Sequence, residues 1–216
     1  MREKTRVLLL AADPFPETRL RLEKEVRAID AAIQRGSARD ELELVPHFAV
    51  RVQDLQAVLL RHRPQVVHFA GHGDFSGGIV LGDETDQPQN VDRNAINVLF
   101  GTLANPPRVV VLNACSTLTA EDTGGSVVDV TVGMNNRIGD SSAILFAEAF
   151  YGALAERETV ARSFAHGVVR LQLERSPDAT IPVLRIRAGV DPETIRLVRP
   201  RPGDRGHGAS PGSRSG

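Results

Sequence analysis

Short apolar runs alternate with amphipathic segments along most of the chain. The apolar runs are rich in valine, isoleucine and leucine, which is typical of strands buried on both faces of a sheet. Between them, apolar residues recur at the spacing of one helical face, as Leu22, Val26 and Ile29 do, with charged residues opposite. The pattern predicts six strands of one sheet, at residues 5–12, 42–50, 65–70, 108–112, 127–134 and 181–186.

Helices are predicted in most of the intervals between these strands, at residues 17–34, 54–61, 92–103, 140–155 and from 159 onward. This alternation indicates an α/β fold with a mainly parallel sheet and helices on both faces. Asp140 or Ser141 is the expected N-cap of one helix and Thr159 of the next. The short run 79–81, set between glycines, is predicted to form half of a small hairpin. Pro182 places the last strand at an edge of the sheet.

Composition indicates one globular domain followed by a tail. The chain has 216 residues, 41% hydrophobic and 25% charged, with a net charge of −1. We assign residues 1–198 to the domain and 199–216, which are rich in Pro, Gly, Ser and Arg, to a disordered tail. The balanced charge gives no footprint for nucleic acid, and no apolar run approaches the roughly 20 residues that span a bilayer. Membrane and nucleic-acid partners are therefore not expected.

One predicted helix carries an unusual surface. Residues 143–154 are apolar nearly all round, interrupted mainly by Glu148. Such a helix is either buried beneath its neighbours or supports an interface, as in a homodimer. The sequence leaves both interpretations open.

Candidate chemistry lies at the ends of two predicted strands. His72 follows the apolar run that ends at residue 70, and Cys115 follows the run that ends at residue 112. In open α/β sheets, reactive groups lie beyond the carboxyl ends of the strands. Neighbouring strands are about 4.8 Å apart, so an imidazole there could reach a thiol and activate it. The flanking Gly71 and Gly73 would let the backbone approach a ligand closely.

His68 and the cysteine count narrow the kinds of chemistry that the chain could carry. His68 lies on the same strand face as His72 but roughly 13 Å away, at about 3.3 Å per residue, so we interpret it as a packed, hydrogen-bonded core residue rather than a metal ligand. Cys115 is the only cysteine, which excludes an internal disulfide and a thiolate-rich zinc site and favours a cytoplasmic location. Phosphate-binding glycine motifs are missing as well. Since the metal ligands considered above are also excluded, we expect neither a metal nor a cofactor.

The segments around His72 and Cys115 resemble the caspase-like cysteine peptidases of clan CD, and most closely the bacterial CHAT domains. The matching pieces are residues 67–73, Val-His-Phe-Ala-Gly-His-Gly, and 110–117, Val-Val-Leu-Asn-Ala-Cys-Ser-Thr. The resemblance continues through residues 132–134, Asp140 and 146–154 and covers roughly residues 5–188. It implies a caspase-like three-layer sandwich with a mainly parallel six-stranded sheet flanked by helices.

The resemblance also implies roles for individual residues. Cys115 would attack the scissile carbonyl of a protein or peptide substrate, and His72 would protonate the leaving amine. The backbone N–H groups of Gly73 and Cys115 would form the oxyanion hole. Asn113 stands where the superfamily borders the pocket for the residue before the cut, and its neutral side chain leaves the charge preference open. Acidic residues such as Asp74 would either favour a basic substrate residue or serve as ordinary solvated loop charges.

Two functions of different classes follow. The first is a cysteine endopeptidase, a bacterial signalling or defence effector. Because the chain shows no recognisable sensor or repeat domain, we expect that a separate regulatory protein activates it in trans or that the enzyme is unregulated. The second is a catalytically silent caspase-like module that binds a protein partner. The presence of both His72 and Cys115 favours the peptidase. A flavodoxin-like cofactor binder fits the strand–helix alternation but lacks a phosphate-cradling loop.

Overall fold

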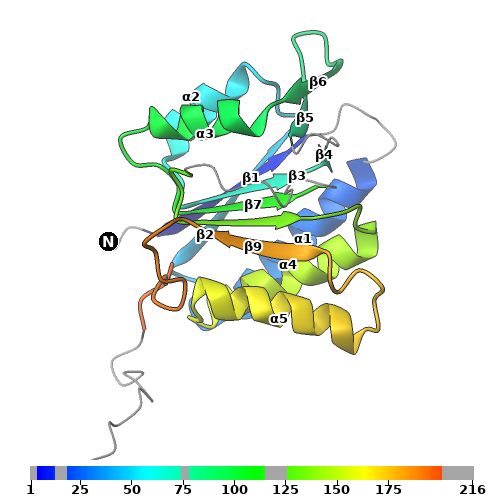
Figure 1. Cartoon of the computed structure of the whole chain (residues 1–216), viewed down its shortest axis with the longest axis vertical. Helices are drawn as coiled ribbons and strands as arrows, with labels where there is room; N and C mark the ends of the chain where they lie inside the picture. The colour runs from blue at the N-terminus through cyan, green and yellow to red at the C-terminus, as the bar shows by residue number, and fades with distance from the viewer. Residues whose placement is uncertain (1–3, 13–18, 74–77, 115–125, 201–216) are drawn as a thin grey trace, which may run out of the picture.

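The computed structural model describes residues 4–12, 19–73, 78–114 and 126–200. Within these ranges, a six-stranded sheet has the order β2-β1-β3-β7-β8-β9 (Figure 1). Five of the strands run parallel and β9 pairs antiparallel with β8 at one edge. The strands are β1 (Thr5–Ala11), β2 (Leu42–Phe48), β3 (Val66–Ala70), β7 (Val109–Asn113), β8 (Val130–Met134) and β9 (Pro182–Ile186).

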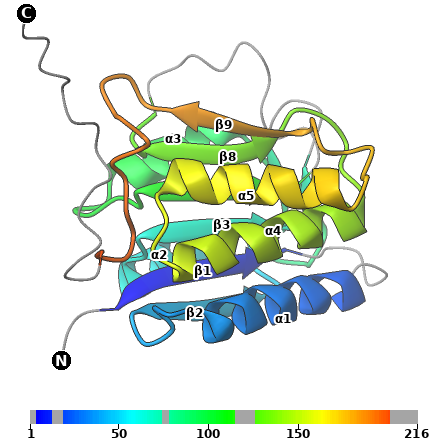
Figure 2. The same cartoon turned by 90° about the horizontal axis from the view of Figure 1, so that it is seen from below.

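Helices cover both faces of this sheet, so the predicted α/β three-layer sandwich is confirmed. On one face lie α2 (Asp54–His62) and α3 (Arg93–Gly101), and on the other lie α1 (Arg19–Arg35), α4 (Asp140–Ala155) and α5 (Val160–Leu173). Figure 2 shows these last three helices side by side, with α4 in the middle. Burial between α1 and α5 accounts for the nearly uniform apolar surface of α4.

The core is divided between the two faces of the sheet because side chains alternate along each strand. On β3, Val66 and Ala70 face α1 and α4, whereas Val67 and Phe69 face α2 and α3. Both sets are nearly free of solvent exposure. This double burial explains why the strands read as continuous apolar runs in the sequence.

A second, small sheet lies beyond the carboxyl end of β3. It has the order β4-β5-β6, with β4 at His72–Gly73, β5 at Ile79–Gly82 and β6 at Pro88–Val91. Both pairings are antiparallel. The hairpin predicted around residues 79–81 is thus present as β5 and β6, and β4 adds a third strand that the sequence did not indicate.

The two predicted helix caps have different outcomes. Thr159 is the N-cap of α5, and its Oγ1 accepts a hydrogen bond from the Arg162 N–H at 3.2 Å. The prediction for α4 was wrong: Gly139 is the N-cap residue, and no side chain caps this end. The Asp140 carboxylate instead accepts a hydrogen bond from Arg21 of α1 at 2.7 Å, so it ties two helices together.

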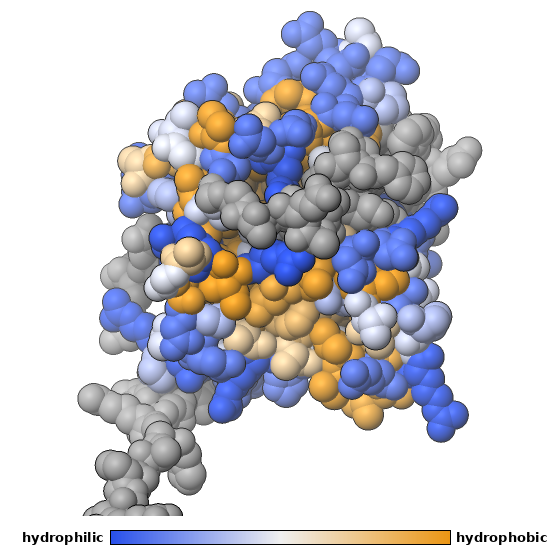
Figure 3. Space-filling model, viewed as in Figure 1, coloured by the Kyte–Doolittle hydropathy of each residue, from blue (hydrophilic) through white to orange (hydrophobic). Residues whose placement is uncertain are grey.

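Apolar surface gathers over β9 and α5 on one side of the molecule (Figure 3). Among the residues of these two elements, Val169 and Leu173 of α5 and Ile186 of β9 are large apolar residues with exposed surface. Isolated exposed apolar residues are common on soluble proteins. The homodimer therefore stays a prediction.

Close packing between α4 and α5 makes Gly167 hard to replace. A methyl group at Gly167 would lie 2.5 Å from a ring carbon of the fully buried Phe146. We expect Gly167→Ala to lower the unfolding free energy by about 1–3 kcal/mol, measured by urea denaturation. Gly152→Ala is the matched control, because its methyl group would meet only Ala32 at 3.9 Å; it should be neutral or stabilise by up to about 1 kcal/mol. Equal effects of the two changes would contradict this account.

A histidine pair makes stability depend on pH. His47 of β2 and His62 of α2 have their Nε2 atoms 3.0 Å apart, and burial together with the nearby His47 lowers the pKa of His62. The unfolded imidazole takes up a proton as pH falls through about 6.5, whereas the folded one does so only at lower pH. The unfolding free energy should therefore fall as pH drops through this window.

Denaturation between pH 7.5 and pH 5 checks this expectation. His62→Gln should make the pH dependence of the unfolding free energy shallower, and His166→Gln, on the exposed side of α5, should leave it unchanged. An unchanged pH dependence in His62→Gln would show that the pair does not contribute.

Candidate functional site

The parallel pairing of β3 with β7 brings the two candidate segments to one edge of the sheet. The register runs from Val66 opposite Val109 to Ala70 opposite Asn113, so the two strands are neighbours, which the sequence had left open. His72 and Cys115 each follow two residues after the last pair, Ala70 and Asn113. Cys115 and Asp74 lie outside the described residues, and the roles of both stay predictions.

The backbone at His72 is held by the small sheet. His72 pairs with Val80 and Gly73 with Ile79, and both Val80 and Ile79 are buried. The sequence indicated no strand at His72, but His72 begins the short strand β4. Strand pairing fixes the course of the backbone here more firmly than a loop would.

Gly71 is required by packing within the protein. Its φ is +156°, and an added Cβ would lie 2.5 Å from the carbonyl oxygen of Ala12. The Ala12 N–H in turn donates to Ala70 O at 3.0 Å. At this position the close neighbour is the end of β1, and the expectation that Gly71 also allows close approach of a ligand stays a prediction.

Arg21 of α1 joins this turn to α4. Its Nη1 donates to Asp140 Oδ1 at 2.7 Å and its Nη2 to Gly71 O at 3.3 Å. These two hydrogen bonds link the residue before His72 to the start of α4. The Arg21 side chain is only 19% exposed, so the link lies in partly buried surroundings. Nothing in the sequence distinguished Arg21 from the other charged residues of its helix.

Beneath the strand ends lies a buried polar cluster, formed by Glu25, His68, Asn113 and Tyr151. All four are at most 4% exposed. His68 Nε2 lies 3.0 Å from Glu25 Oε1, and His68 Nδ1 lies 3.0 Å from the Tyr151 hydroxyl. The interpretation of His68 as a packed, hydrogen-bonded core residue is therefore confirmed. The cluster links α1, β3, β7 and α4.

The cluster has a consistent donor and acceptor assignment. The Asn113 amide donates to the same oxygen, Glu25 Oε1, and also to Ala143 O at 3.3 Å. Glu25 Oε1 is thus the shared acceptor, and His68 donates to it through Nε2–H. In a neutral imidazole this leaves Nδ1 to accept the Tyr151 hydroxyl proton. Burial, with a smaller contribution from the Glu25 charge, raises the pKa of Tyr151 well above its ordinary value, so that hydroxyl keeps its proton.

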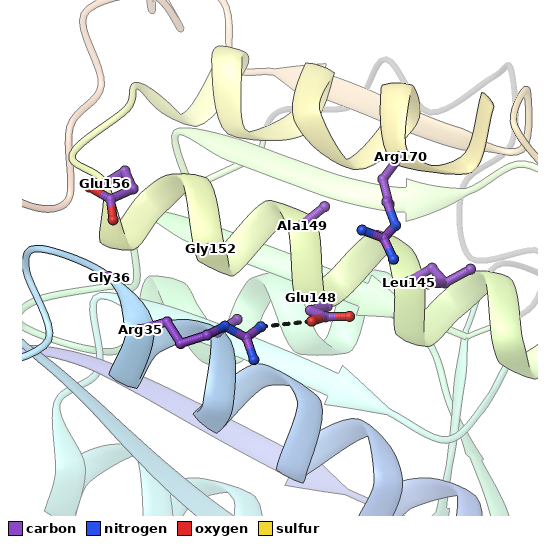
Figure 4. Close-up of a pocket in the computed structure, with 9 residues that line it drawn as sticks. Arg35, Gly36, Leu145, Glu148, Ala149, Gly152, Glu156 and Arg170 are labelled. Atoms are coloured by element: carbon purple, nitrogen blue, oxygen red, sulfur yellow. Dashed lines mark hydrogen bonds and ion pairs between the residues drawn. The ribbon is translucent and has the colours of Figure 1, made fainter. Parts of the chain in front are cut away.

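A separate groove lies on the helical face, between α1, α4 and α5. Its volume is about 270 Å³, and the ion pair from Arg35 to Glu148, at 2.7 Å, crosses it (Figure 4). Its lining residues, which are all in the described ranges, contain neither cysteine nor histidine. This groove therefore does not supply the groups needed for the predicted thiol chemistry.

Two further observations concern the described ranges alone. No three side chains of His, Cys, Asp or Glu there converge as ligands of a metal ion. No helix there combines the length and apolar character needed to cross a membrane.

Comparison with known proteins identifies the family. The family model of the CHAT domain matches residues 5–181, and the chain belongs to this family. A Roc-COR-CHAT protease from an unknown prokaryotic organism is 22% identical over 168 residues, which make up 74% of this chain and 16% of that relative. The chain thus spans less than a fifth of the length of that curated relative.

A solved structure shares the fold. A secreted C11 cysteine protease from Bacteroides thetaiotaomicron, solved in complex with an irreversible peptide inhibitor, matches with a TM-score of 0.58 at 13% identity. The match covers 76% of this chain and 57% of that one. The caspase-like fold expected from the sequence is therefore confirmed, and the family is one of caspase-like cysteine peptidases.

Removing one hydroxyl tests the buried cluster. Tyr151→Phe preserves the ring but leaves His68 Nδ1 without its partner, so we expect the unfolding free energy to fall by about 1–3 kcal/mol. Urea denaturation with far-ultraviolet circular dichroism measures the change. Val169→Ala, at a half-exposed position of α5, should cost less. A loss below about 0.5 kcal/mol in Tyr151→Phe would contradict the assignment.

Proposed function

We propose that this chain is a cysteine endopeptidase that hydrolyses peptide bonds with Cys115 and His72. The observation that supports it most is the in-register pairing of β3 with β7, because both candidate residues follow these strands at one edge of the sheet. Membership of the CHAT family adds independent support. The buried cluster below the strand ends would hold both segments in place.

The proposed reaction has two stages. In the first, the Cys115 thiolate attacks the scissile carbonyl carbon, and the His72 imidazolium gives its proton to the leaving amine as the C–N bond breaks. In the second, water attacks the resulting thioester; its proton returns to His72, and Cys115 leaves as thiolate. The N–H groups of Gly73 and Cys115 would stabilise the oxyanion in each stage.

Substrate recognition and regulation belong to the same proposal. Asn113 and Asp74 would contribute to the binding of a protein or peptide substrate. We propose that the enzyme acts in a bacterial signalling or defence system and that a separate protein activates it in trans. A single cysteine suits the reducing cytoplasm, where we place it.

A peptide-based electrophile tests the dyad. A peptidyl acyloxymethyl ketone should label the wild-type protein at Cys115, not label Cys115→Ala, and label His72→Ala at least tenfold more slowly, because catalytic bases typically contribute about 10²–10⁴-fold. Mass spectrometry of the intact protein gives the rates. His166→Ala, distant on α5, should react like the wild type.

The same experiment separates the two candidate functions. Equal labelling of the wild type and His72→Ala would mean an exposed thiol without a base, and would favour the catalytically silent interaction module. Labelling of Cys115→Ala would contradict Cys115 as the nucleophile.

A further inference from the structure

The orientation of the Asn113 side chain is fixed by two acceptors. Its Nδ2 group faces Glu25 Oε1 and the Ala143 carbonyl oxygen. An amide oxygen in that position would face two other oxygens without a proton between them, so the NH₂ group must occupy it. These two neighbouring oxygens therefore determine that the NH₂ end of the amide, and not its oxygen, points to the helices.

Glu25 is the residue that sets this orientation. It is 3% exposed on α1, and its Oε1 accepts from both Asn113 and His68. Because His68 is itself held by Tyr151 at its other nitrogen, Glu25 is anchored from the opposite side. The Asn113 amide therefore cannot rotate without breaking a hydrogen bond in a buried cluster.

This arrangement leaves one atom of the side chain without a partner. Asn113 is 4% exposed, and within the described part of the chain its Oδ1 is buried and accepts no hydrogen bond. A buried acceptor without a donor is unfavourable for folding, because the oxygen has lost its hydrogen bonds to water. Oδ1 is turned away from both acceptors of Nδ2, and Asn113 ends β7, two residues before Cys115.

We propose that Glu25 is a specificity-determining positioning residue: it fixes Asn113 as an acceptor, so that the site selects a hydrogen-bond donor on the substrate residue that precedes the cut. This inference rests on the proposed function, because it places Asn113 beside that substrate residue. Lysine, arginine, glutamine and asparagine side chains carry such donors, whereas ionised aspartate and glutamate carry only acceptors.

Glutamine and glutamate at that substrate position provide a matched test, because they share a shape and differ in their donors. Two peptidyl acyloxymethyl ketones identical except for this residue are compared by their second-order rates of inactivating the wild-type protein. We expect the glutamine compound to react at least about tenfold faster. An equal or faster rate for the glutamate compound would overturn the proposal.

Two substitutions test the role of Glu25. Glu25→Gln offers an NH₂ group as well as an oxygen, which lets the Asn113 amide turn, so the preference for glutamine should fall at least threefold. Asn113→Leu removes the acceptor and should abolish the preference. Glu23→Gln, the same change two residues earlier on α1, should retain it. A wild-type preference in Glu25→Gln would show that Glu25 does not set the orientation.

A control on thiol reactivity separates specificity from general damage. Iodoacetamide has no side chain to recognise and Cys115 is the only cysteine, so its alkylation rate, which should agree within about twofold in the wild type and Glu23→Gln, is the reference to which the peptidyl rates of each variant are normalised. If Glu25→Gln loses its far-ultraviolet circular dichroism, it has not folded and is not used. The ratio of the glutamine to the glutamate rate in the wild type, compared with the same ratio in Asn113→Leu, then tests the proposal.

A binding measurement distinguishes failure of this inference from failure of the proposed function. Cys115→Ala is titrated with the corresponding glutamine and glutamate peptide amides and followed by nuclear magnetic resonance. Tighter binding of the glutamine peptide supports the inference even where His72→Ala shows that the dyad is inactive. Equal affinities, or tighter binding of the glutamate peptide, overturn it.

Discussion

The backbone hydrogen bonds between β3 and β7 decide where almost every other element of this chain can lie. These two strands are the centre of the sheet, and their side chains are buried on both faces. A shift of one residue in their register would move Val67 and Phe69 to the face of α1 and α4 and would turn His68 toward α2 and α3. Packing against the apolar faces of the two helical layers therefore fixes this register, and with it the relative position of the two strand ends.

His68 and Asn113 break the apolar pattern of these strands at one place. Both lie on the face that otherwise carries Val66, Ala70, Val109 and Val111, where an apolar side chain would pack without needing any partner. Their polar atoms have to be satisfied by Glu25 and Tyr151 from the covering helices. Local exceptions of this kind, which sacrifice simple packing, are expected where function constrains a fold. Here the exception adjoins the segments that carry His72 and Cys115.

The sequence was informative where one segment determines its own structure. Runs such as 109–112 have to be strands, and the spacing of Leu22, Ile29 and Ile33 has to form a helix, because each pattern is local. β6 could not be found this way: Pro88–Val91 is polar and largely exposed, and it is a strand only because β5 offers hydrogen bonds.

The candidate site was predictable to the same degree. His72 and Cys115 stood out by their places after apolar runs, but the sequence left open whether β3 and β7 are neighbours, and only the structure shows that they pair. Glu25 and Arg21 were not found, since each lies among other charged residues of α1. Their structural roles follow only from contacts with residues that are distant in the sequence. Glu25 and Asn113 are 88 residues apart, and no local pattern records such a contact.

That separation also has a consequence for biosynthesis. Cys115 leaves the ribosome well before Tyr151, and the buried cluster cannot close until α4 has been made and has docked between α1 and the sheet. A nascent or truncated chain that ends before α4 would carry the thiol without the hydrogen bonds that fix Asn113. The long-range cluster thus makes the fixed orientation of Asn113 a property of the finished domain, which no unfinished chain can have.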